Sequence, residues 1–218
     1  MSIEKTVEKL ETRINELESE VRTLKDIEEI KRLQRIYGYY IEQWKSKEIF
    51  ELFARNPEVS VKVNAGEFNG PESVKWYYFH GRNPEEPQPA PARDFFYQVM
   101  QHCPVIDVAP DGLRARGRWY GFGANAFPVK GGVAPGWIDG VYENEYIQED
   151  GVWKFLKLHW CMFFDAPFAL SWVKPEKRVD IYNKPDFSLL KPDGPAEDTE
   201  YPSGFHAPYH YKNPVTGK

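Results

Sequence analysis

The stretch from Gly140 to Trp160 constrains the fold more than any other part of this chain. Two aromatic-rich runs meet there at Glu149-Asp150-Gly151. Asp-Gly between such runs is the strongest short-range signal of a β-hairpin. Because this hairpin comes late in the chain, after helical patterns near the start, it predicts a helix-plus-curved-sheet domain of the α+β class. In such a domain, the function depends on what the cavity enclosed by the sheet can bind.

The composition of the chain limits its partners and its compartment. A length of 218 residues suits one domain with appendages, and a net charge of −5 does not suggest the basic face of a nucleic-acid-binding protein. No apolar run approaches the ~20 residues that span a bilayer, and the charged start does not read as a signal peptide. Cys103 and Cys161 are interpreted as buried thiols. We therefore expect a cytoplasmic protein with no nucleic-acid or membrane partner.

Residues 1–25 carry the heptad pattern of a coiled coil. Apolar residues recur at alternating steps of four and three, with β-branched residues at one seam position and leucine at the other, which favours a parallel two-stranded coil. Arg13 could pair with Glu18 of a second copy, and Glu20 with Lys25. The alternative is an amphipathic helix packed on its own domain. We expect a homo-oligomer, a dimer or a trimer, with a seam of Ile3, Val7, Leu10, Ile14, Leu17, Val21 and Leu24.

Residues 26–165 are expected to form the main domain. Asp26 is a good N-cap for a new helix, whose apolar stripe must face a core. The proline-rich, polar stretch that follows the third helix is expected to be a loop. In chain order, the predicted elements are the helix from Asp26, a short helix over 46–54, a strand over 59–64, a helix over 70–78, the loop over 82–91, strands over 104–109 and 113–122, a glycine-rich loop over 129–136, and the hairpin.

Residues 166–218 are rich in proline and aromatic residues and show no periodicity. Disordered segments are poor in aromatic residues, so we expect an extended arm that packs across the domain or a neighbouring subunit. His206 and His210 are four residues apart, as two zinc ligands on one helix face would be. The prolines around them argue against a helix, so we expect no metal site.

The order of these elements resembles the SnoaL-like branch of the nuclear transport factor 2 superfamily. The similar stretches, within 26–165, read DIEEIKRLQRIYGYYIEQWKSKEIFELFA, GEFNGPESV, HCPVIDVAPDGLRARGRW and GVYENEYIQEDGVWKF. The resemblance implies a cone, in which a bent antiparallel sheet wraps around helices and an apolar cavity lies at the mouth. Members include cofactor-free dehydratases, isomerases and cyclases, and also binding and scaffold subunits, so the fold does not settle the function.

Within that superfamily the chain is similar to the scytalone dehydratase family. Gln101-His102-Cys103 resembles one motif of that family, and GVWKF in the hairpin matches another. The resemblance implies a catalytic role for His102 and places Glu42 where the related helix carries an acidic residue. Two departures count against a two-histidine, water-eliminating site. The second catalytic histidine has no counterpart in Arg116-Gly117-Arg118-Trp119, and Tyr142 stands at the position of the active-site asparagine.

We expect polar side chains to converge in an aromatic cavity. A neutral histidine can move a proton near pH 7, tyrosines can orient an oxygen, and an arginine can hold an oxyanion. A one-residue shift of register would turn Arg118 to solvent and bring Trp119 to the cavity instead. Each side chain also has a purely structural explanation. His102 would be a core histidine with its hydrogen bonds satisfied, Tyr40 a core aromatic residue, and Glu42 a solvated helix residue. The predicted catalytic residues are His102, Glu42, Tyr40, Arg118 and His159, and the predicted substrate-binding residues are Trp119, Tyr142, Asn64 and Phe122.

These observations together predict a cofactor-free lyase that acts by acid/base chemistry on a phenolic aromatic small molecule. Superfamily members that release formaldehyde from lignin-derived diarylpropanes, leaving stilbenes, resemble this profile most specifically. One alternative is dehydration or isomerisation of a polyketide or steroid-like ring. The other is a non-catalytic binding or scaffold subunit, whose cavity would be filled with apolar side chains.

Overall fold

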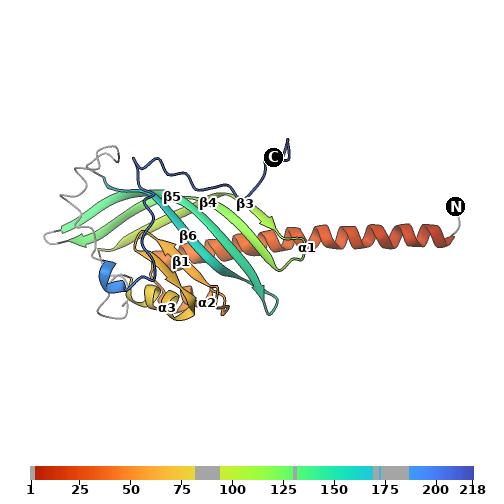
Figure 1. The fold of residues 1–218 in the computed structure, drawn as a ribbon, viewed down its shortest axis with the longest axis horizontal. Helices are drawn as coiled ribbons and strands as arrows, with labels where there is room; N and C mark the ends of the chain where they lie inside the picture. Colours follow the sequence, from red (N-terminus) through yellow and green to blue (C-terminus); the bar gives the residue numbers. More distant parts are fainter. Residues whose placement is uncertain (1–2, 82–93, 130–131, 169–171, 173–186) are drawn as a thin grey trace.

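The computed structural model describes residues 3–81, 94–129, 132–168, 172 and 187–218 (Figure 1). Within these residues, three helices and a short 3-10 turn accompany six strands of a single sheet. In chain order, the elements are α1 (Ile3–Glu42), α2 (Ser46–Glu51), β1 (Ser60–Val63), β2 (Gly66–Asn69), α3 (Gly70–His80), β3 (Phe96–Val108), β4 (Arg114–Val129), β5 (Gly132–Glu149), β6 (Val152–Pro167) and η2 (Phe187–Leu190).

The six strands form one curved, open sheet in the order β2-β1-β6-β5-β4-β3. All neighbours are antiparallel except β1 and β6, which run parallel. The hairpin between β5 and β6 turns at Asp150 and Gly151, which both have positive φ, as the favoured two-residue hairpin turn requires. The predicted α+β class and the predicted late hairpin are therefore confirmed.

Bulges bend the long strands around the helices. Register shifts interrupt the pairing between His102 and Val105 and between Asp139 and Gly140, and a bulge bends its strand and increases its twist. On the inner side of the bend, a Cβ on Gly140 would lie 2.7 Å from the ring of Trp160. A side chain at this position would push the tryptophan off the sheet, so the curvature and the glycine are linked.

Strand alternation gives the sheet two faces, for which we use fixed names. The concave face is the one that packs on α1, where the glycine at position 38 abuts the side chain of Gln101. The convex face is the one that the C-terminal arm crosses (Figure 1). The core lies between α1 and the concave face, and among its largest fully buried side chains are Trp119, Tyr78, Tyr146, Phe68 and Phe155.

A buried amide joins α1 to the sheet. Gln34 is fully buried, and its Nε2 donates to Oε1 of Gln101 on β3 at 2.8 Å. Its Oε1 accepts from Nδ2 of Asn144 at 2.9 Å and from the hydroxyl of Tyr146 at 2.7 Å, both on β5. The Tyr146 hydroxyl in turn accepts from Nε1 of Trp119 on β4. One side chain of α1 thereby fixes three neighbouring strands.

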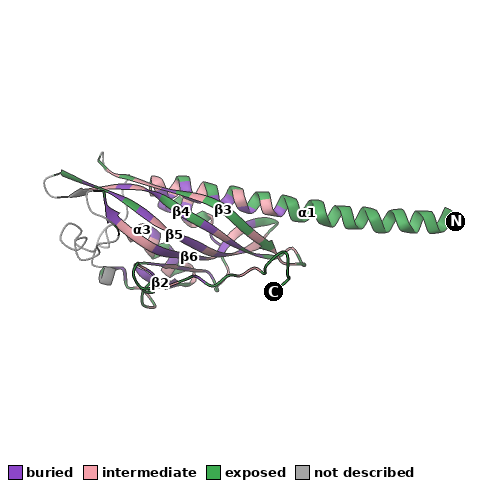
Figure 2. Ribbon diagram, turned by 90° about the horizontal axis from the view of Figure 1, so that it is seen from above, coloured by how far each residue is buried: buried purple, intermediate pink, exposed green. Residues whose placement is uncertain are grey.

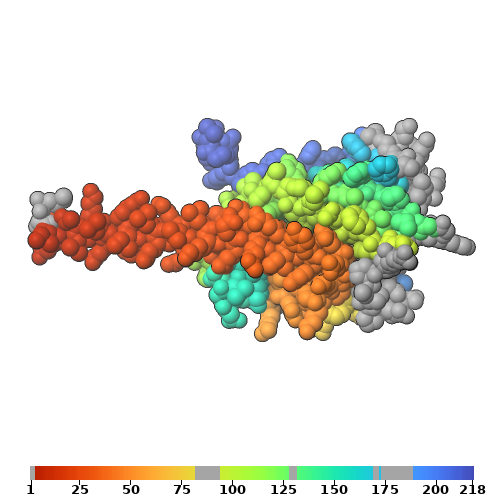
Figure 3. All heavy atoms as spheres, turned by 180° about the vertical axis from the view of Figure 1, so that it is seen from behind, coloured from red at the N-terminus to blue at the C-terminus, as the bar shows by residue number. Residues whose placement is uncertain are grey.

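Helix α1 is continuous, which corrects the prediction that a new helix begins at Asp26. Asp26 is buried inside the helix, and its carboxylate accepts a hydrogen bond from Nε1 of Trp153 at 2.8 Å. The cap signal failed because no glycine or proline interrupts the pattern before that residue, so the helix continues through it. The helix up to Lys25 is exposed and stands clear of the domain (Figures 2 and 3).

Two other predictions are corrected by the structure. Cys103, predicted to be buried, is exposed at the bulge of β3, where its φ is +49°. The predicted glycine-rich loop over 129–136 is mostly strand, because Gly132–Gly136 pairs with β4 and tertiary pairing outweighs the weak strand propensity of these residues. The predicted loop over 82–91 lies outside the described residues.

The described part of the arm is extended and packs on the sheet. Near its start, Asp193 accepts hydrogen bonds from the backbone of Asn69 and the hydroxyl of Ser73. Further along, the buried Thr199 donates to the carbonyl of Met162 on β6. The arm therefore crosses from the β2 edge over β6. Among the described residues, no helix has the length and apolar character needed to cross a membrane.

Replacing the buried amide should cost stability out of proportion to its size. Gln34→Ala leaves a donor and an acceptor buried without partners, so we expect the free energy of unfolding to fall by at least about 3 kcal/mol. Arg35→Ala, one residue along on the exposed side of α1, should change it by no more than about 0.5 kcal/mol. Urea unfolding of both variants measures the difference. Equal losses would contradict the role given to Gln34.

The parallel coil stays a prediction, and its seam is exposed along α1. An aspartate pair on the seam (Leu10→Asp with Leu17→Asp) should weaken self-association, because charges cannot occupy the core of a coil. Thr12→Asp with Ser19→Asp adds the same charge on the opposite side of the helix and should leave the mass unchanged. Sedimentation equilibrium measures the mass of the assembly formed by the 25.5 kDa chain in each double variant. Identical masses for both double variants would refute the coil.

Candidate functional site

The structure brings two of the predicted residues to the concave face. Trp119 is buried there, with its indole N–H on the Tyr146 hydroxyl at 3.0 Å. Tyr142, also buried, lies beside Trp160 with ring centroids 4.4 Å apart. Of the two registers considered from the sequence, the structure has the one that points Trp119 inward and Arg118 outward.

Four other predicted residues lie on the convex face, so the predicted convergence around one cavity is wrong. His102 is exposed beside the β3 bulge, one residue after the inward-facing Gln101. Phe122 is exposed and stacks on Trp137, with ring centroids 5.8 Å apart. Arg118 and His159 contact the arm instead of the core. The physical reason is the two-residue period of a strand, which sends neighbouring side chains to opposite faces.

The remaining predicted residues lie at the edges of the domain. Glu42, at the end of α1, accepts a long hydrogen bond from Nε2 of Gln98 at 3.4 Å. Tyr40 packs against the core, with the ammonium of Lys45 6.0 Å from its ring. Asn64 is exposed in the turn between β1 and β2 and borders a surface hollow formed with residues 196–203 of the arm.

Five tyrosines gather at the concave face, and sequence reasoning singled out only one of them, Tyr142, for the functional site. Tyr37 comes from α1, Tyr77 and Tyr78 from α3, Tyr97 from β3 and Tyr142 from β5. Burial raises the pKa of every one of these phenols, and neighbouring tyrosines of the group raise it further for all but Tyr77. At neutral pH they are therefore neutral hydrogen-bond donors rather than bases.

Three of these hydroxyls are available to a ligand. The Tyr78 hydroxyl donates to that of Tyr37 at 3.3 Å. Among the described residues, the hydroxyls of Tyr77, Tyr97 and Tyr142 have no hydrogen-bond partner. None of these three oxygens is among the fully buried polar atoms without a partner in the described part of the chain, so each can be reached by solvent or a ligand. Unpaired hydroxyls on three different elements indicate a place where a small molecule or water would be bound.

A carboxylate lies next to this group. Asp165 on β6 pairs with Ile138, which is buried on the concave face. Its Oδ1 accepts a hydrogen bond from Nδ2 of the buried Asn125 at 2.9 Å. The pKa of Tyr97 is raised first by burial, then by the neighbouring Tyr77, and third by the negative charge of Asp165. The concave face thus offers a held carboxylate beside neutral phenol donors, which is a set of groups that can accept and donate protons.

An ion pair between β4 and β5 on the convex face provides contacts that hold the arm. Arg118 pairs with Glu143 of β5, donates to the carbonyl of Ala207 at 3.2 Å, and lies over the ring of Tyr209 at 4.6 Å. Nδ1 of His210 lies 3.0 Å from Glu143. The predicted catalytic Arg118 therefore forms a docking point for the arm.

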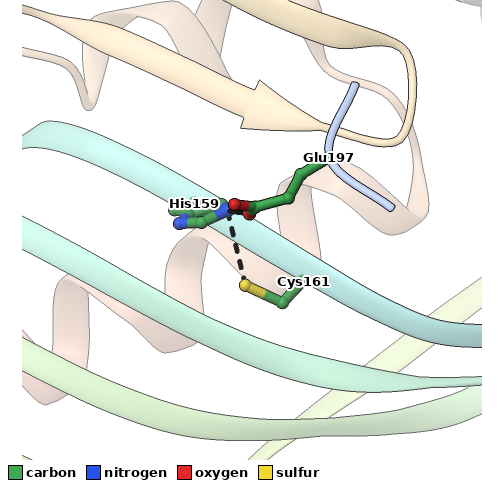
Figure 4. Close-up of side chains that lie close together, drawn as sticks. All are labelled: His159, Cys161 and Glu197. Carbon is green, nitrogen blue, oxygen red and sulfur yellow. Dashed lines mark hydrogen bonds and ion pairs between the residues drawn. The ribbon is translucent and has the colours of Figure 1, made fainter. Parts of the chain in front are cut away.

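A second cluster on that face contains His159, Cys161 and Glu197 (Figure 4). Burial raises the pKa of the Cys161 thiol to about 12, with smaller contributions from Glu197 and Glu143. A thiol so far from ionisation is not a nucleophile at neutral pH. Burial also lowers the pKa of His159, against the opposing effect of Glu197, so this imidazole is neutral near pH 7.

Comparison with known proteins agrees with this fold. Residues 22–159 match the family model described as the SnoaL-like domain. A candidate scytalone dehydratase from Novosphingobium aromaticivorans DSM 12444 has a similar structure, with a TM-score of 0.51 and 18% identity over 69% of this chain and 92% of that one. No curated protein matches the chain.

Two other solved structures are similar. The hexachlorocyclohexane dehydrochlorinase LinA-type3 from Novosphingobium barchaimii LL02 has a TM-score of 0.54 and 20% identity, over 69% of this chain and 94% of that one. A candidate aromatic ring hydroxylase from Novosphingobium aromaticivorans has a TM-score of 0.51 and 13% identity, over 66% and 94% of the two chains. At these identities the likeness concerns the fold.

Removing Arg118 should release the arm. Arg118→Ala breaks a mostly buried ion pair and leaves Glu143 without its guanidinium partner, so we expect a loss of about 2–4 kcal/mol in the free energy of unfolding. Limited proteolysis of the arm should also become faster. Arg116→Ala, exposed on the same face of β4, is the matched control. If the two variants were cleaved at the same rate, Arg118 would not anchor the arm.

Proposed function

Since the chain belongs to the SnoaL-like domain family, we propose that it is a lyase acting by acid/base chemistry on a phenolic aromatic small molecule. The observation that carries this proposal is the group of unpaired tyrosine hydroxyls beside the carboxylate of Asp165. Membership of the superfamily alone does not distinguish an enzyme from a non-catalytic binding subunit. A held carboxylate among neutral donors favours proton transfer.

Substrate recognition would come from aromatic side chains and phenol donors. Tyr142 and Trp160 lie against each other, largely buried, on the concave face, and a flat ligand bound there would pack against such rings. The hydroxyls of Tyr77 and Tyr97 would donate to a phenol or carbonyl oxygen of that ligand. Donors on packed side chains are already oriented, so they stabilise developing negative charge better than water does.

The acid/base role falls to Asp165. Asn125 fixes one carboxylate oxygen, and a carboxylate so oriented can accept a proton and return it to a leaving group. The other amide atom of Asn125, Oδ1, is buried without a partner among the described residues. It is therefore a further polar group that a ligand would satisfy.

In its most specific form, the reaction would convert a diarylpropane diol into a stilbene. A para-phenol first expels the benzylic hydroxyl as water, giving a quinone methide. Asp165 then takes the proton of the hydroxymethyl group, the carbon–carbon bond breaks, and formaldehyde leaves. The electron pair of that bond forms the alkene and restores the phenolate, which takes back a proton. The products are one stilbene, one water and one formaldehyde for each diol.

One other reaction class is favoured by a specific observation. The similar structures include a candidate scytalone dehydratase and a dehydrochlorinase, names that denote loss of water or of HCl. Dehydration or isomerisation of a polyketide or steroid-like ring needs the same carboxylate and the same oxygen donors. Identification of the leaving group separates the two reactions.

Product analysis by mass, on diarylpropane diols, naphthols and steroid-like ketones, tests the proposal. Asp165→Asn should lower kcat/KM at least about a thousandfold, because the amide cannot accept the proton. Tyr97→Phe should lower it about tenfold or more through loss of one donor.

The controls separate this site from the convex face. Asp139→Asn, half-buried on that face of β5, and His102→Ala should each retain activity within a few-fold of the unmodified chain. A loss in His102→Ala with none in Asp165→Asn would overturn the proposed site. Binding without turnover of any compound would favour a non-catalytic subunit.

A further inference from the structure

The cluster of His159, Cys161 and Glu197 has the composition of a metal site. His159 and Cys161 are two residues apart on β6, so both side chains leave the same face of the strand. The arm brings Glu197 over them from more than thirty residues along the chain (Figure 4). Nε2 of His159 lies 3.0 Å from Oε2 of Glu197 and 3.4 Å from Sγ of Cys161.

The geometry differs from that of a catalytic triad. In a triad the histidine uses one ring nitrogen for the nucleophile and the other for the carboxylate. Here the same nitrogen, Nε2, faces both the thiol and the carboxylate. This arrangement cannot relay a proton, but it points three donor atoms toward one small volume.

We propose that Nε2 of His159, Sγ of Cys161 and Oε2 of Glu197 bind a divalent transition metal, for which Zn²⁺ is the best fit. Usual zinc bond lengths in a tetrahedron separate nitrogen from sulfur by about 3.6 Å and nitrogen from oxygen by about 3.4 Å. The observed separations are 3.4 and 3.0 Å, and all three donor atoms lie within 4.8 Å of one another. One thiolate, one imidazole and one carboxylate form a donor set that suits zinc.

The surroundings orient one ligand of the cluster and leave the cluster open to solvent. The ammonium of Lys62 lies 3.4 Å from Oε1 of Glu197, so it orients the carboxylate and leaves Oε2 toward His159. His159 and Glu197 keep 26% and 34% of their side-chain surface exposed, which gives a metal a route from solvent. The thiol of Cys161 loses its proton to solvent when it binds. Three protein ligands leave a fourth position for water.

The metal would tie the arm to the sheet. His159 and Cys161 belong to β6, whereas Glu197 belongs to the arm. A bond to all three therefore adds to the contacts that already hold the arm, such as those of Arg118 with Ala207 and of Thr199 with Met162. This inference concerns the convex face and does not depend on the reaction proposed for the concave face.

Cobalt titration of the full chain, stripped of metal and kept reduced, tests the site. We expect one Co²⁺ per chain, a thiolate-to-cobalt charge-transfer band in the near ultraviolet, displacement of Co²⁺ by Zn²⁺, and slower proteolysis of the arm with Zn²⁺ present. Cys161→Ser should abolish the band. Glu197→Gln, an exposed change that leaves the core intact, should weaken Co²⁺ binding at least tenfold.

The second cysteine provides the matched control. Cys103→Ser removes the exposed thiol and should leave the band, the stoichiometry and the affinity unchanged. The proposal is overturned if the unmodified chain binds no Co²⁺ stoichiometrically, which would leave only a hydrogen bond between His159 and Glu197. It is equally overturned if the band survives in Cys161→Ser or disappears in Cys103→Ser.

Discussion

The buried amide of Gln34 is the interaction on which the rest of the structure depends. It bonds to β3 and β5, and through Tyr146 it reaches Trp119 on β4. Because every group in this network is neutral at physiological pH, it holds the helix without adding charge to the core. Once α1 is fixed against these strands, the direction of every inward side chain of the sheet is fixed as well.

The two faces of the sheet consequently differ in chemistry. The concave face collects neutral phenols, amides and the carboxylate of Asp165 in surroundings that raise the pKa of tyrosine. The convex face carries the ion pair of Arg118 with Glu143 and the contact between His159 and Glu197, and the arm docks there. A molecule with a phenol or carbonyl oxygen suits the first face, whereas a metal ion suits the second. Because neighbouring residues of a strand point to opposite faces, residues adjacent in the sequence belong to two different kinds of site on the two sides of the sheet.

Local signals predicted the fold well because they depend on a few adjacent residues. The turn at Asp150 and Gly151 has its own backbone preference, and the helix stripes and the strands follow from periodicity. The predicted start of a helix at Asp26 was wrong, because the helix continues through that residue and its carboxylate accepts from Trp153, which is distant in the chain. No local pattern reports a partner so far away.

The site was harder to predict, because it depends on which way each strand faces. Similarity of a motif around His102 says nothing of the bulge beside it, and the structure turns that side chain outward. Tyr77, Tyr97 and Asp165 come from a helix and two strands that only the folded sheet brings together. The two-residue spacing of Tyr97, Val99 and Gln101 was the available signal, since it marks one face of β3 as inward.

A crystal structure with a bound phenolic diarylpropane tests the central claim most directly. If the concave face is the site, an oxygen of the ligand will lie within hydrogen-bonding distance of Tyr97 or Tyr142, and the ligand will contact Asp165. A ligand bound beside His102 or beneath the arm, with the concave face filled by protein side chains, would contradict the account.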